Sequence, residues 1–299
     1  MIPDKRIIEI FEKKHYFIVR INRIDTLFRI IVLLILFQFI ASCSYSVPKD
    51  NITFVQSTVQ AKPIEQDTIA NILIKRFNPP QGYDIIQSDS NSFAYYLQHL
   101  PLKNHGSPVH LYNGKIKPSY GIYCAVVDYS LGNRDLQQCA DAVMRLRAEY
   151  LYRQHAFDDI HFNFVSDGKP RYYSDYAKGD TSYSVFLNYL DYIFSYANTR
   201  SLYNELKPVD SINKMKIGDV FIQRGNPYGH AIIVINMAYE IDTGNKLFML
   251  AQSYMPAQDI QILINRENPE NSPWYTLKEG TVQTPEWTFY SSDLHRFPE

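Results

Sequence analysis

The chain has 299 residues, of which 45% are hydrophobic, and its formal net charge at pH 7 is -1. This apolar content is enough for a packed core and excludes a chain that is disordered throughout. The balanced charge argues against a broad nucleic-acid-binding surface, which needs an excess of basic residues. We therefore expect a folded protein with one large domain or two small ones, and no nucleic acid among its partners.

The first 42 residues have the pattern of an export signal. Several basic residues precede the apolar run IIVLLILFQFI at residues 30–40, and Ala41 and Ser42 follow it. The run is too short to cross a bilayer of about 30 Å as a helix. A basic flank, a short apolar run and small residues are typical of a signal peptide. The segment before the run is long for one, so a misassigned start codon or an uncleaved anchoring helix over residues 27–41 are the alternatives.

Ile40, Ala41, Ser42 and Cys43 together resemble the lipobox of bacterial lipoproteins. The resemblance implies that Cys43 is lipidated and becomes the first mature residue. An acyl chain would anchor the protein by burying methylenes, each worth about 0.8 kcal/mol. Ser44 follows, which by analogy with lipoprotein sorting indicates the outer membrane. The prediction is thus an exported protein, held in the bacterial cell envelope by a lipid anchor at Cys43.

After the lipidation motif, residues 43–66 are polar and lack periodicity, so they predict a tether, and residues 67–299 are expected to form a single domain. Apolar and β-branched runs predict strands at 121–129, 160–164, 220–223, 230–240, 246–254 and 259–264. The segment 242–245, DTGN, predicts a hairpin turn between two of these strands. Helices are expected before 154 and over 182–197. This order predicts an α+β fold with long helices packed on an antiparallel sheet.

The helix that ends near Gln154 is the clearest prediction, with N-cap candidates at 133 and 135. Cys139 falls on its apolar stripe. Asp141, Arg145 and Glu149 follow one another at i,i+4 spacing on another face, which favours a solvated helix surface over a cleft lining. A weaker acid/base candidate, Asp159 with His161, borders the strand at 160–164.

Three residues could form a thiol-based catalytic site. Cys139 lies on a helix, His230 begins a strand, and Gln252 lies on the next strand. A nucleophilic thiol needs a base to take its proton, and the base needs a polar group to fix its tautomer. A helix N-terminus also lowers the pKa of a thiol. Cys139, His230 and Gln252, in this chain order, are therefore candidates for such a site.

The segment GDVFIQRGNPYGHAIIVI, residues 218–235, resembles the block around the histidine of papain-like cell-wall amidopeptidases of the CHAP and NlpC types. The resemblance implies a papain-like fold and hydrolysis of amide bonds in envelope peptide or glycopeptide. Carried over to this chain, it implies that Cys139 is the nucleophile, His230 the general base and Gln252 the residue that orients His230. One departure is that the cysteine of those families usually starts its helix, whereas the best caps here lie four to six residues before Cys139.

A second resemblance covers nearly all of the predicted exported part. It is carried by RFNPPQGY, SFAYYLQHLPL, DLQQCADAVMRLRAEYLY, LAQSYMPAQDIQIL and SPWY. These segments are similar to the bacterial family catalogued as domain of unknown function 4846. That family implies no particular activity.

Each site residue also has a structural alternative. Cys139 could be a buried core thiol, or it could pair with Cys124 in a disulfide worth about 3 kcal/mol. His230 could be a hydrogen-bonded histidine at a strand end, and Gln252 a satisfied polar group. No spacing of His with Cys suggests a metal site, and no cofactor is expected.

The rival function is a non-catalytic envelope lipoprotein that binds glycan or a partner protein. Its candidate contacts are Trp274, Tyr275 and Trp287, in loop-like stretches, with support from the 24 tyrosines of the chain. Aromatic rings stack on sugars, although they also pack as lids over a sheet. The enzyme hypothesis requires Cys139 and His230 to share an open cleft, whereas the binding hypothesis requires exposed aromatic rings.

Overall fold

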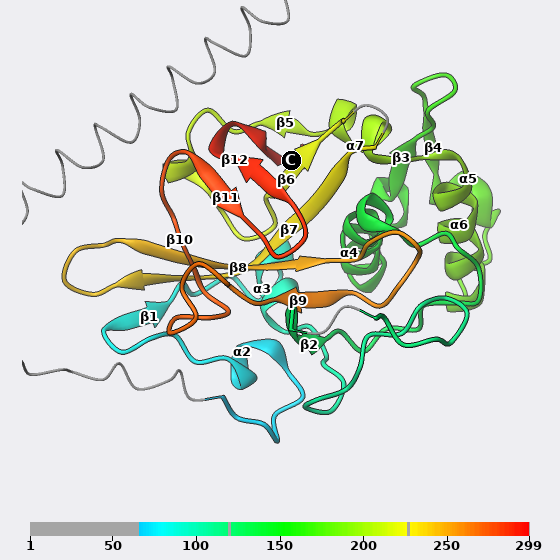
Figure 1. The fold of residues 1–299 in the computed structure, drawn as a ribbon. Helices are drawn as coiled ribbons and strands as arrows, with labels where there is room; N and C mark the ends of the chain where they lie inside the picture. The colour runs from blue at the N-terminus through cyan, green and yellow to red at the C-terminus, as the bar shows by residue number, and fades with distance from the viewer. Residues whose placement is uncertain (1–65, 119–120, 226–227, 299) are drawn as a thin grey trace, which may run out of the picture. The chain divides into compact units, whose positions relative to one another are not determined.

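The fold combines short helices with many strands (Figure 1). The computed structural model describes residues 66–298 apart from 119–120 and 226–227. The predicted export signal, the predicted lipidation site Cys43 and the predicted tether up to residue 65 lie outside the described residues. The helices are α2 (Leu73–Arg76), α3 (Phe93–Gln98), α4 (Cys139–Arg153), α5 (Tyr173–Ala177), α6 (Tyr183–Tyr196) and α7 (Thr199–Glu205), with 3-10 turns η1 (Phe157–Asp159), η2 (Ile212–Lys214) and η3 (Ser291–Asp293).

The described residues form thirteen strands, of which nine belong to one antiparallel sheet that organises the domain. The strands are β1 (Tyr83–Ile85), β2 (Tyr123–Val126), β3 (His161–Asn163), β4 (Pro170–Tyr172), β5 (Lys207–Pro208), β6 (Val220–Gln223), β7 (His230–Glu240), β8 (Lys246–Gln252), β9 (Gln261–Leu263), β10 (Tyr275–Thr276), β11 (Thr281–Gln283), β12 (Thr288–Tyr290) and β13 (Leu294–Arg296). The main path of the sheet is β2-β9-β8-β7-β6-β13-β5, with β1 paired to β7 and β10 to β8. Two further pairs, β11-β12 and β3-β4, are separate. The α+β class with an antiparallel sheet is therefore confirmed.

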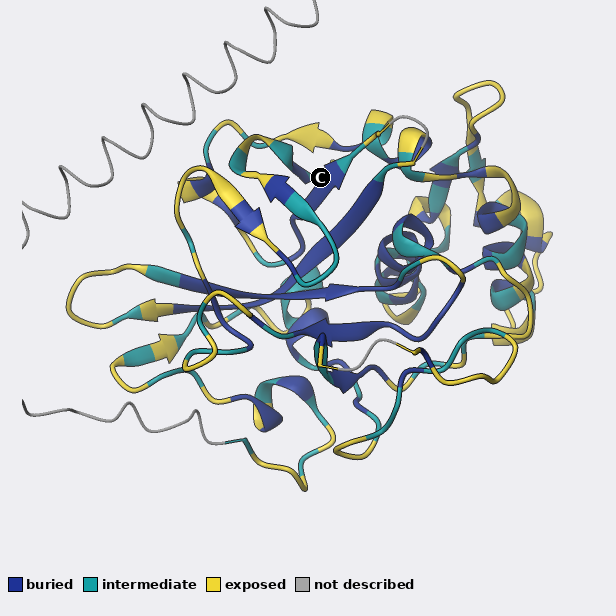
Figure 2. Ribbon diagram, in the orientation of Figure 1, coloured by how far each residue is buried: buried dark blue, intermediate teal, exposed yellow. Residues whose placement is uncertain are grey.

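Strand β7 is buried along most of its length because both faces of the sheet are covered (Figure 2). Ile233 and Ile235 belong to the core that also contains the apolar residues of α4. Ile232 and Val234 point to a second core, which the β11-β12 pair closes with Phe289. A strand buried on both faces needs apolar residues at successive positions. This explains the unbroken apolar run after His230.

The helices are shorter than the sequence pattern predicts. Of the described helices, α4 has 15 residues and α6 has 14, while the others have seven or fewer. The expectation of long helices packed on the sheet is therefore wrong. The domain is held together mainly by strand pairing and by the two cores on either side of the sheet.

Candidate functional site

Cys139 is the first residue of α4, not a residue of its second turn. Gln138 is the N-cap, and its backbone N–H donates to Asp141 Oδ2 at 3.0 Å, which closes the first turn. The predicted cap Asp135 instead accepts the backbone N–H of Ala257 at 2.7 Å. The helix start predicted at 133–135 is therefore wrong, and the correction matters chemically. Cys139 lies where the free N–H groups and dipole of the helix act most strongly on a thiol.

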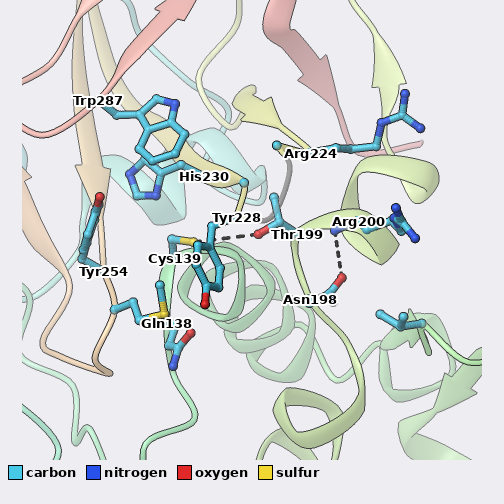
Figure 3. A pocket seen from close by; sticks show the side chains of 14 residues that line it. Gln138, Cys139, Asn198, Thr199, Arg200, Arg224, Tyr228, His230, Tyr254 and Trp287 are labelled. Carbon is cyan, nitrogen blue, oxygen red and sulfur yellow. Dashed lines mark hydrogen bonds between the residues drawn. The ribbon is translucent and has the colours of Figure 1, made fainter. Parts of the chain in front are cut away.

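Cys139 and His230 line the same pocket, which has a volume of about 520 Å³ (Figure 3). Figure 3 shows the thiol between the His230 ring on one side and Thr199 on the other. The sulfur lies 3.9 Å from Thr199 Oγ1, and within the described part of the chain no hydrogen bond joins it directly to His230. The lining residues are Gln138, Cys139, Val165, Asn198, Thr199, Arg200, Arg224, Gly225, Tyr228, Gly229, His230, Tyr254, Met255 and Trp287.

Gln252 is bound to His230 from the neighbouring strand. His230 is the first residue of β7 and Gln252 the last of β8, and these strands pair in antiparallel fashion. His230 Nε2 lies 3.0 Å from Gln252 Oε1, and both side chains are almost fully buried. The structure thus brings together all three residues that the sequence selected, with Gln252 in direct contact with the imidazole.

A buried chain of hydrogen bonds fixes which ring nitrogen of His230 carries the proton. Gln252 Nε2 donates to Glu286 Oε2 at 2.6 Å, and Lys117 Nζ donates to the same oxygen at 2.8 Å. Because an ionised carboxylate only accepts, Gln252 must turn its amide nitrogen to Glu286 and its oxygen to His230. His230 Nε2 is therefore the protonated nitrogen. Nδ1 keeps its lone pair and, among the described residues, has no hydrogen-bond partner.

Burial keeps both reactive groups neutral. It raises the pKa of the Cys139 thiol, and nearby Asp141 raises it further, while the backbone N–H of Ala231 opposes the shift. Burial also lowers the pKa of His230 to about 4, against the effect of the Gln252 hydrogen bond. At neutral pH the molecule therefore holds a thiol and a neutral imidazole in this pocket rather than a preformed thiolate–imidazolium pair.

Aromatic rings surround the imidazole of His230. The Tyr254 ring lies 4.9 Å away, the Trp287 ring 5.2 Å and the Phe289 ring 5.8 Å, measured between ring centroids. Trp287 is itself held by a 2.9 Å hydrogen bond from Nε1 to Gln223 Oε1. These rings give the imidazole an apolar setting, in which a hydrogen bond is stronger than in water.

Comparison with known proteins gives the family but no activity. A family model described as domain of unknown function (4846) matches residues 73–296. The chain belongs to this family. The match contains Cys139, His230, Gln252 and Glu286, so the whole pocket lies inside the family domain. No curated protein and no solved structure shows a significant match to the chain.

The second described cysteine has a purely structural position in the family domain. Cys124 and Cys139 are both free thiols, so the alternative of a disulfide between them is wrong for this structure. Cys124 lies on β2, its Sγ donates to the carbonyl oxygen of Ile262 at 3.6 Å, and burial raises its pKa to about 12. It is therefore a natural control for the chemistry of Cys139.

Two of the three aromatic residues expected to bind a ligand are buried. Trp274 has no exposed surface and Tyr275 only 4%. Their polar atoms bond to backbone oxygens: Trp274 Nε1 to Asn78 at 3.0 Å and Tyr275 Oη to Ile264 at 2.5 Å. The assignment of these two rings to a glycan-binding surface is therefore wrong. Trp287 is half-buried and lines the pocket beside His230.

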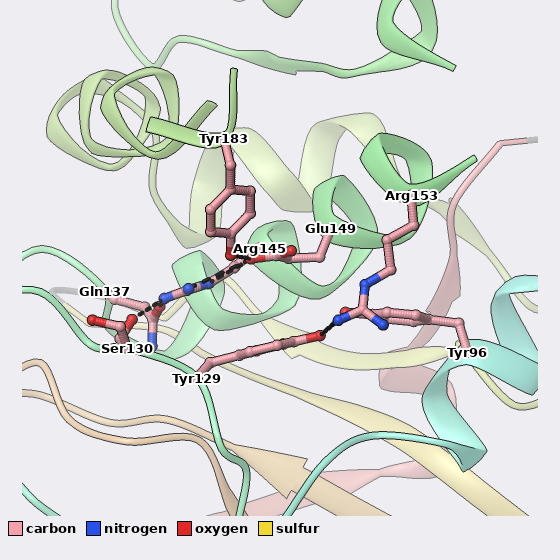
Figure 4. Close-up of polar contacts among 8 residues, drawn as sticks. All are labelled: Tyr96, Tyr129, Ser130, Gln137, Arg145, Glu149, Arg153 and Tyr183. Atoms are coloured by element: carbon pink, nitrogen blue, oxygen red, sulfur yellow. Dashed lines mark hydrogen bonds and ion pairs between the residues drawn. The ribbon is translucent and has the colours of Figure 1, made fainter. Parts of the chain in front are cut away.

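The charged face of α4 is buried, contrary to the expectation of a solvated face. Asp141, Arg145 and Glu149 are each at most 6% exposed. Arg145 Nη1 donates to Gln137 Oε1 at 2.6 Å, while Glu149 Oε1 accepts the hydroxyl of Tyr183 at 2.7 Å (Figure 4). These contacts hold the segment that leads into Cys139.

The weaker acid/base candidate of the sequence has a different geometry from the one expected. His161 Nδ1 contacts the backbone oxygen of Asp159 at 3.1 Å, not its carboxylate, and both residues line a different pocket. Within residues 66–298, apart from the two short gaps, no group of three or more His, Cys, Asp or Glu side chains could hold a metal ion. Of the described helices, none has both the length and the apolar character to cross a membrane.

Several residues in or beside the pocket have no sequence signal that points to this site. Lys117 and Glu286 come from distant parts of the chain, and Arg200 and Arg224 are exposed arginines of ordinary appearance. Thr199 could have been placed at a helix start, because Asn198 is a good N-cap and its side chain accepts the N–H of Arg200 at 2.9 Å.

The buried neutral His230 gives an expected pH dependence of stability. Because its folded pKa of about 4 lies below the ordinary histidine pKa of 6.5, the unfolded chain binds more protons between these values. The free energy of unfolding should therefore fall as the pH drops from 7 to 4.5, by about 2 kcal/mol from this residue. Urea unfolding at both pH values measures it.

The matched control for that measurement is His230→Gln, which removes the titrating group. Burial raises the pKa of Asp141 to about 8, so its folded form binds the extra proton. Asp141 therefore makes the free energy of unfolding rise as the pH falls, and it does so equally in the wild type and in the variant. The difference between the wild-type and variant slopes therefore isolates His230. Equal slopes would show that the imidazole is not held neutral.

Proposed function

We propose that this protein is a papain-like thiol hydrolase that cleaves amide bonds in peptides or glycopeptides of the cell envelope. The observation that carries the proposal is the hydrogen-bond chain from Glu286 through Gln252 to His230, beside a cysteine at a helix N-terminus. A fixed tautomer with a free Nδ1 is what a base next to a thiol requires. The envelope location rests on the predicted export signal and Cys43.

The proposed reaction has two steps. Cys139 Sγ attacks the carbonyl carbon of the amide while its proton passes to His230 Nδ1. The imidazolium then gives this proton to the leaving amine as the C–N bond breaks, which leaves a thioester on Cys139. A water molecule attacks the thioester, His230 takes a proton from it, and the acid is released as the thiol re-forms. Gln252 Oε1 accepts the hydrogen bond from His230 Nε2–H in every step and so stabilises the imidazolium.

A neutral thiol and a neutral imidazole in the resting protein fit this reaction if the thiol proton moves to His230 only when the substrate carbonyl is in place. In substrate-free enzymes the hydrogen bond between nucleophile and base is often long and tightens in the complex. Among the described residues, the side-chain hydrogen-bond contact of the sulfur is the 3.9 Å one to Thr199 Oγ1, and a contact of this length costs little to break.

Trapping with an electrophilic peptide tests the proposal. A tripeptide with a C-terminal vinyl sulfone is expected to add once to Cys139, and His230→Ala should slow the addition by about 10²-fold or more. Intact-mass and peptide mass spectrometry identify the labelled thiol. Plain iodoacetamide should react slowly with the same residue at pH 7, because burial raises the thiol pKa.

The control in this experiment is Cys124, which should stay unlabelled until the protein is denatured. Equal labelling rates for wild type and His230→Ala would contradict the proposal. So would a vinyl sulfone that reacts with Cys139 only after denaturation, since a sealed core thiol would behave in this way.

A binding module is the second candidate, favoured by a set of exposed tyrosines. Tyr176 on α5 and Tyr196 on α6 are 38% and 56% exposed, and Tyr192 lies between them with ring centroids 5.4 and 5.7 Å away. Such a row of rings could stack on sugars. If trapping fails, loss of glycan binding in Tyr196→Ala would support this function instead.

A further inference from the structure

We propose that the rim of the Cys139 pocket binds a carboxylate of the peptide substrate through Arg200 and Arg224. This inference deepens the proposed function and rests on it, because it names the substrate class for the same pocket. The ligand is a peptide with a free carboxylate, either at its C-terminus or on an acidic side chain, close to the amide that is cleaved.

The charge of the described pocket lining is entirely positive. Arg200 and Arg224 are its only residues with a fixed charge, and it contains no Asp or Glu. The protein as a whole carries a formal net charge of -1, so this is a local property of the pocket. A cleft lined by charge of one sign raises the local concentration of ligands of the opposite sign.

Both guanidinium groups are available. Among the described residues, neither Arg200 nor Arg224 forms a side-chain hydrogen bond or an ion pair. Other arginines of the domain are occupied: Arg145 contacts Glu149, Arg171 contacts Asp167, and Arg296 contacts Asp219. The two rim arginines therefore keep their donors free for a ligand.

The side chain of one rim arginine, Arg224, is already packed against a ring. The guanidinium carbon of Arg224 lies 4.6 Å from the ring centroid of Tyr203, which in turn packs against His295. Arg200 lies in the first turn of α7, where its backbone N–H is held by the Asn198 side chain. A partly ordered arginine loses less conformational entropy when it binds.

The two arginines lie on one side of the pocket. Figure 3 shows both extending away from Tyr254 and Trp287, with Cys139 between the two sides. Thr199, the neighbour of Arg200 in the chain, contacts the Cys139 sulfur at 3.9 Å.

Carboxylate is the group that this pair of side chains fits best. The planar fork of a guanidinium donates two parallel hydrogen bonds to one carboxylate, and two forks can share its oxygens. The aromatic wall of Tyr254 and Trp287 on the other side gives an apolar contact for the remainder of the substrate. The pocket is thus suited to a short peptide with an apolar part and an anionic end.

A pair of peptide mixtures tests the inference without catalysis. Tetrapeptides of random sequence, made once with free C-terminal carboxyl groups and once as C-terminal amides, are captured on immobilised Cys139→Ala protein and counted by mass spectrometry. We expect about tenfold or greater enrichment of carboxylate-bearing peptides. Enrichment of the free-acid pool indicates the C-terminal carboxylate, whereas enrichment of Asp and Glu within the amide pool indicates a side chain.

Variants at the rim complete the test. The double change Arg200→Gln and Arg224→Gln, made in the Cys139→Ala protein, should abolish the enrichment. Arg134→Gln should keep it, since Arg134 is an exposed arginine that pairs with Asp191 outside this pocket. Inorganic phosphate at millimolar concentration should not compete if the fit is to a carboxylate within a peptide.

The outcomes separate this inference from the proposed function. No enrichment, or enrichment that survives the double change, would overturn the carboxylate site even if the vinyl sulfone labels Cys139 as expected. Efficient displacement by phosphate alone would also overturn it, because the rim would then bind any anion. Enrichment without His230-dependent labelling would support the binding site and contradict only the hydrolase.

Discussion

Replacing Cys139 with alanine is expected to lower the rate of peptide hydrolysis by a factor on the order of 10⁴ or more. The thiol forms the covalent bond in the proposed reaction, and Cys139 is the only cysteine of the described pocket lining. The stability change should stay within about 1 kcal/mol, because Cys139 is only half-buried and alanine keeps the helix start. New amine termini in cell-wall peptide fragments, counted by mass spectrometry, measure the rate.

Two variants calibrate this experiment. Cys124→Ala removes a thiol that lies away from the pocket and should retain the wild-type rate per folded molecule. Gln252→Ala should reduce the rate less than Cys139→Ala, because it frees the tautomer of His230 without removing a reacting atom. Hydrolysis that persists in Cys139→Ala would assign the activity to another site.

The sheet and the proximity of His230 to Gln252 could be predicted because local patterns specify them. The apolar run after His230 and the DTGN turn set strand β7 against strand β8. That pairing alone places His230 and Gln252 at the same end of neighbouring strands. Periodicity and turn chemistry are short-range signals, so one sequence is enough to follow them.

The start of α4 could not be predicted, because its capping is not the usual one. Gln138 is not among the favoured N-cap residues, and the better candidate, Asp135, is used by the distant N–H of Ala257. The residues that orient Gln252 are equally distant, since Glu286 is 34 residues away and Lys117 is 169 residues from Glu286. A side-chain network of this kind has no sequence period.

The buried charges of α4 were missed for a related reason. An i,i+4 ladder of opposite charges normally indicates a solvated face. Here the helix is covered on that side as well, by residues 130–137 and by α6, so the ladder lies inside the domain (Figure 4). On this side the helix packs against the rest of the domain through polar contacts and does not face solvent. Its charged residues therefore contribute to the stability of the fold.

Replacing Arg145 with methionine is therefore expected to destabilise the protein by about 3–5 kcal/mol. Arg145 donates to the backbone oxygen of Ser130 at 2.5 Å and to Gln137 Oε1 at 2.6 Å, and its Nε lies 3.4 Å from Glu149 Oε1. Methionine fills much of the same space but leaves the Glu149 carboxylate buried without its cation. Urea unfolding at pH 7 measures the loss as a lower transition midpoint at unchanged slope.

Adding Glu149→Leu to that variant should recover part of the loss, because it removes the unpaired buried charge. The exposed pair Arg134–Asp191 is the matched control, and Arg134→Gln should cost less than about 1 kcal/mol. A cost below 1 kcal/mol for Arg145→Met would contradict the structural role of the buried pair. Gln137 is bound by Arg145 and directly precedes the N-cap of α4. A folded Arg145→Met protein should therefore also react more slowly with the peptidyl vinyl sulfone. This result would show that the buried pair helps to position Cys139.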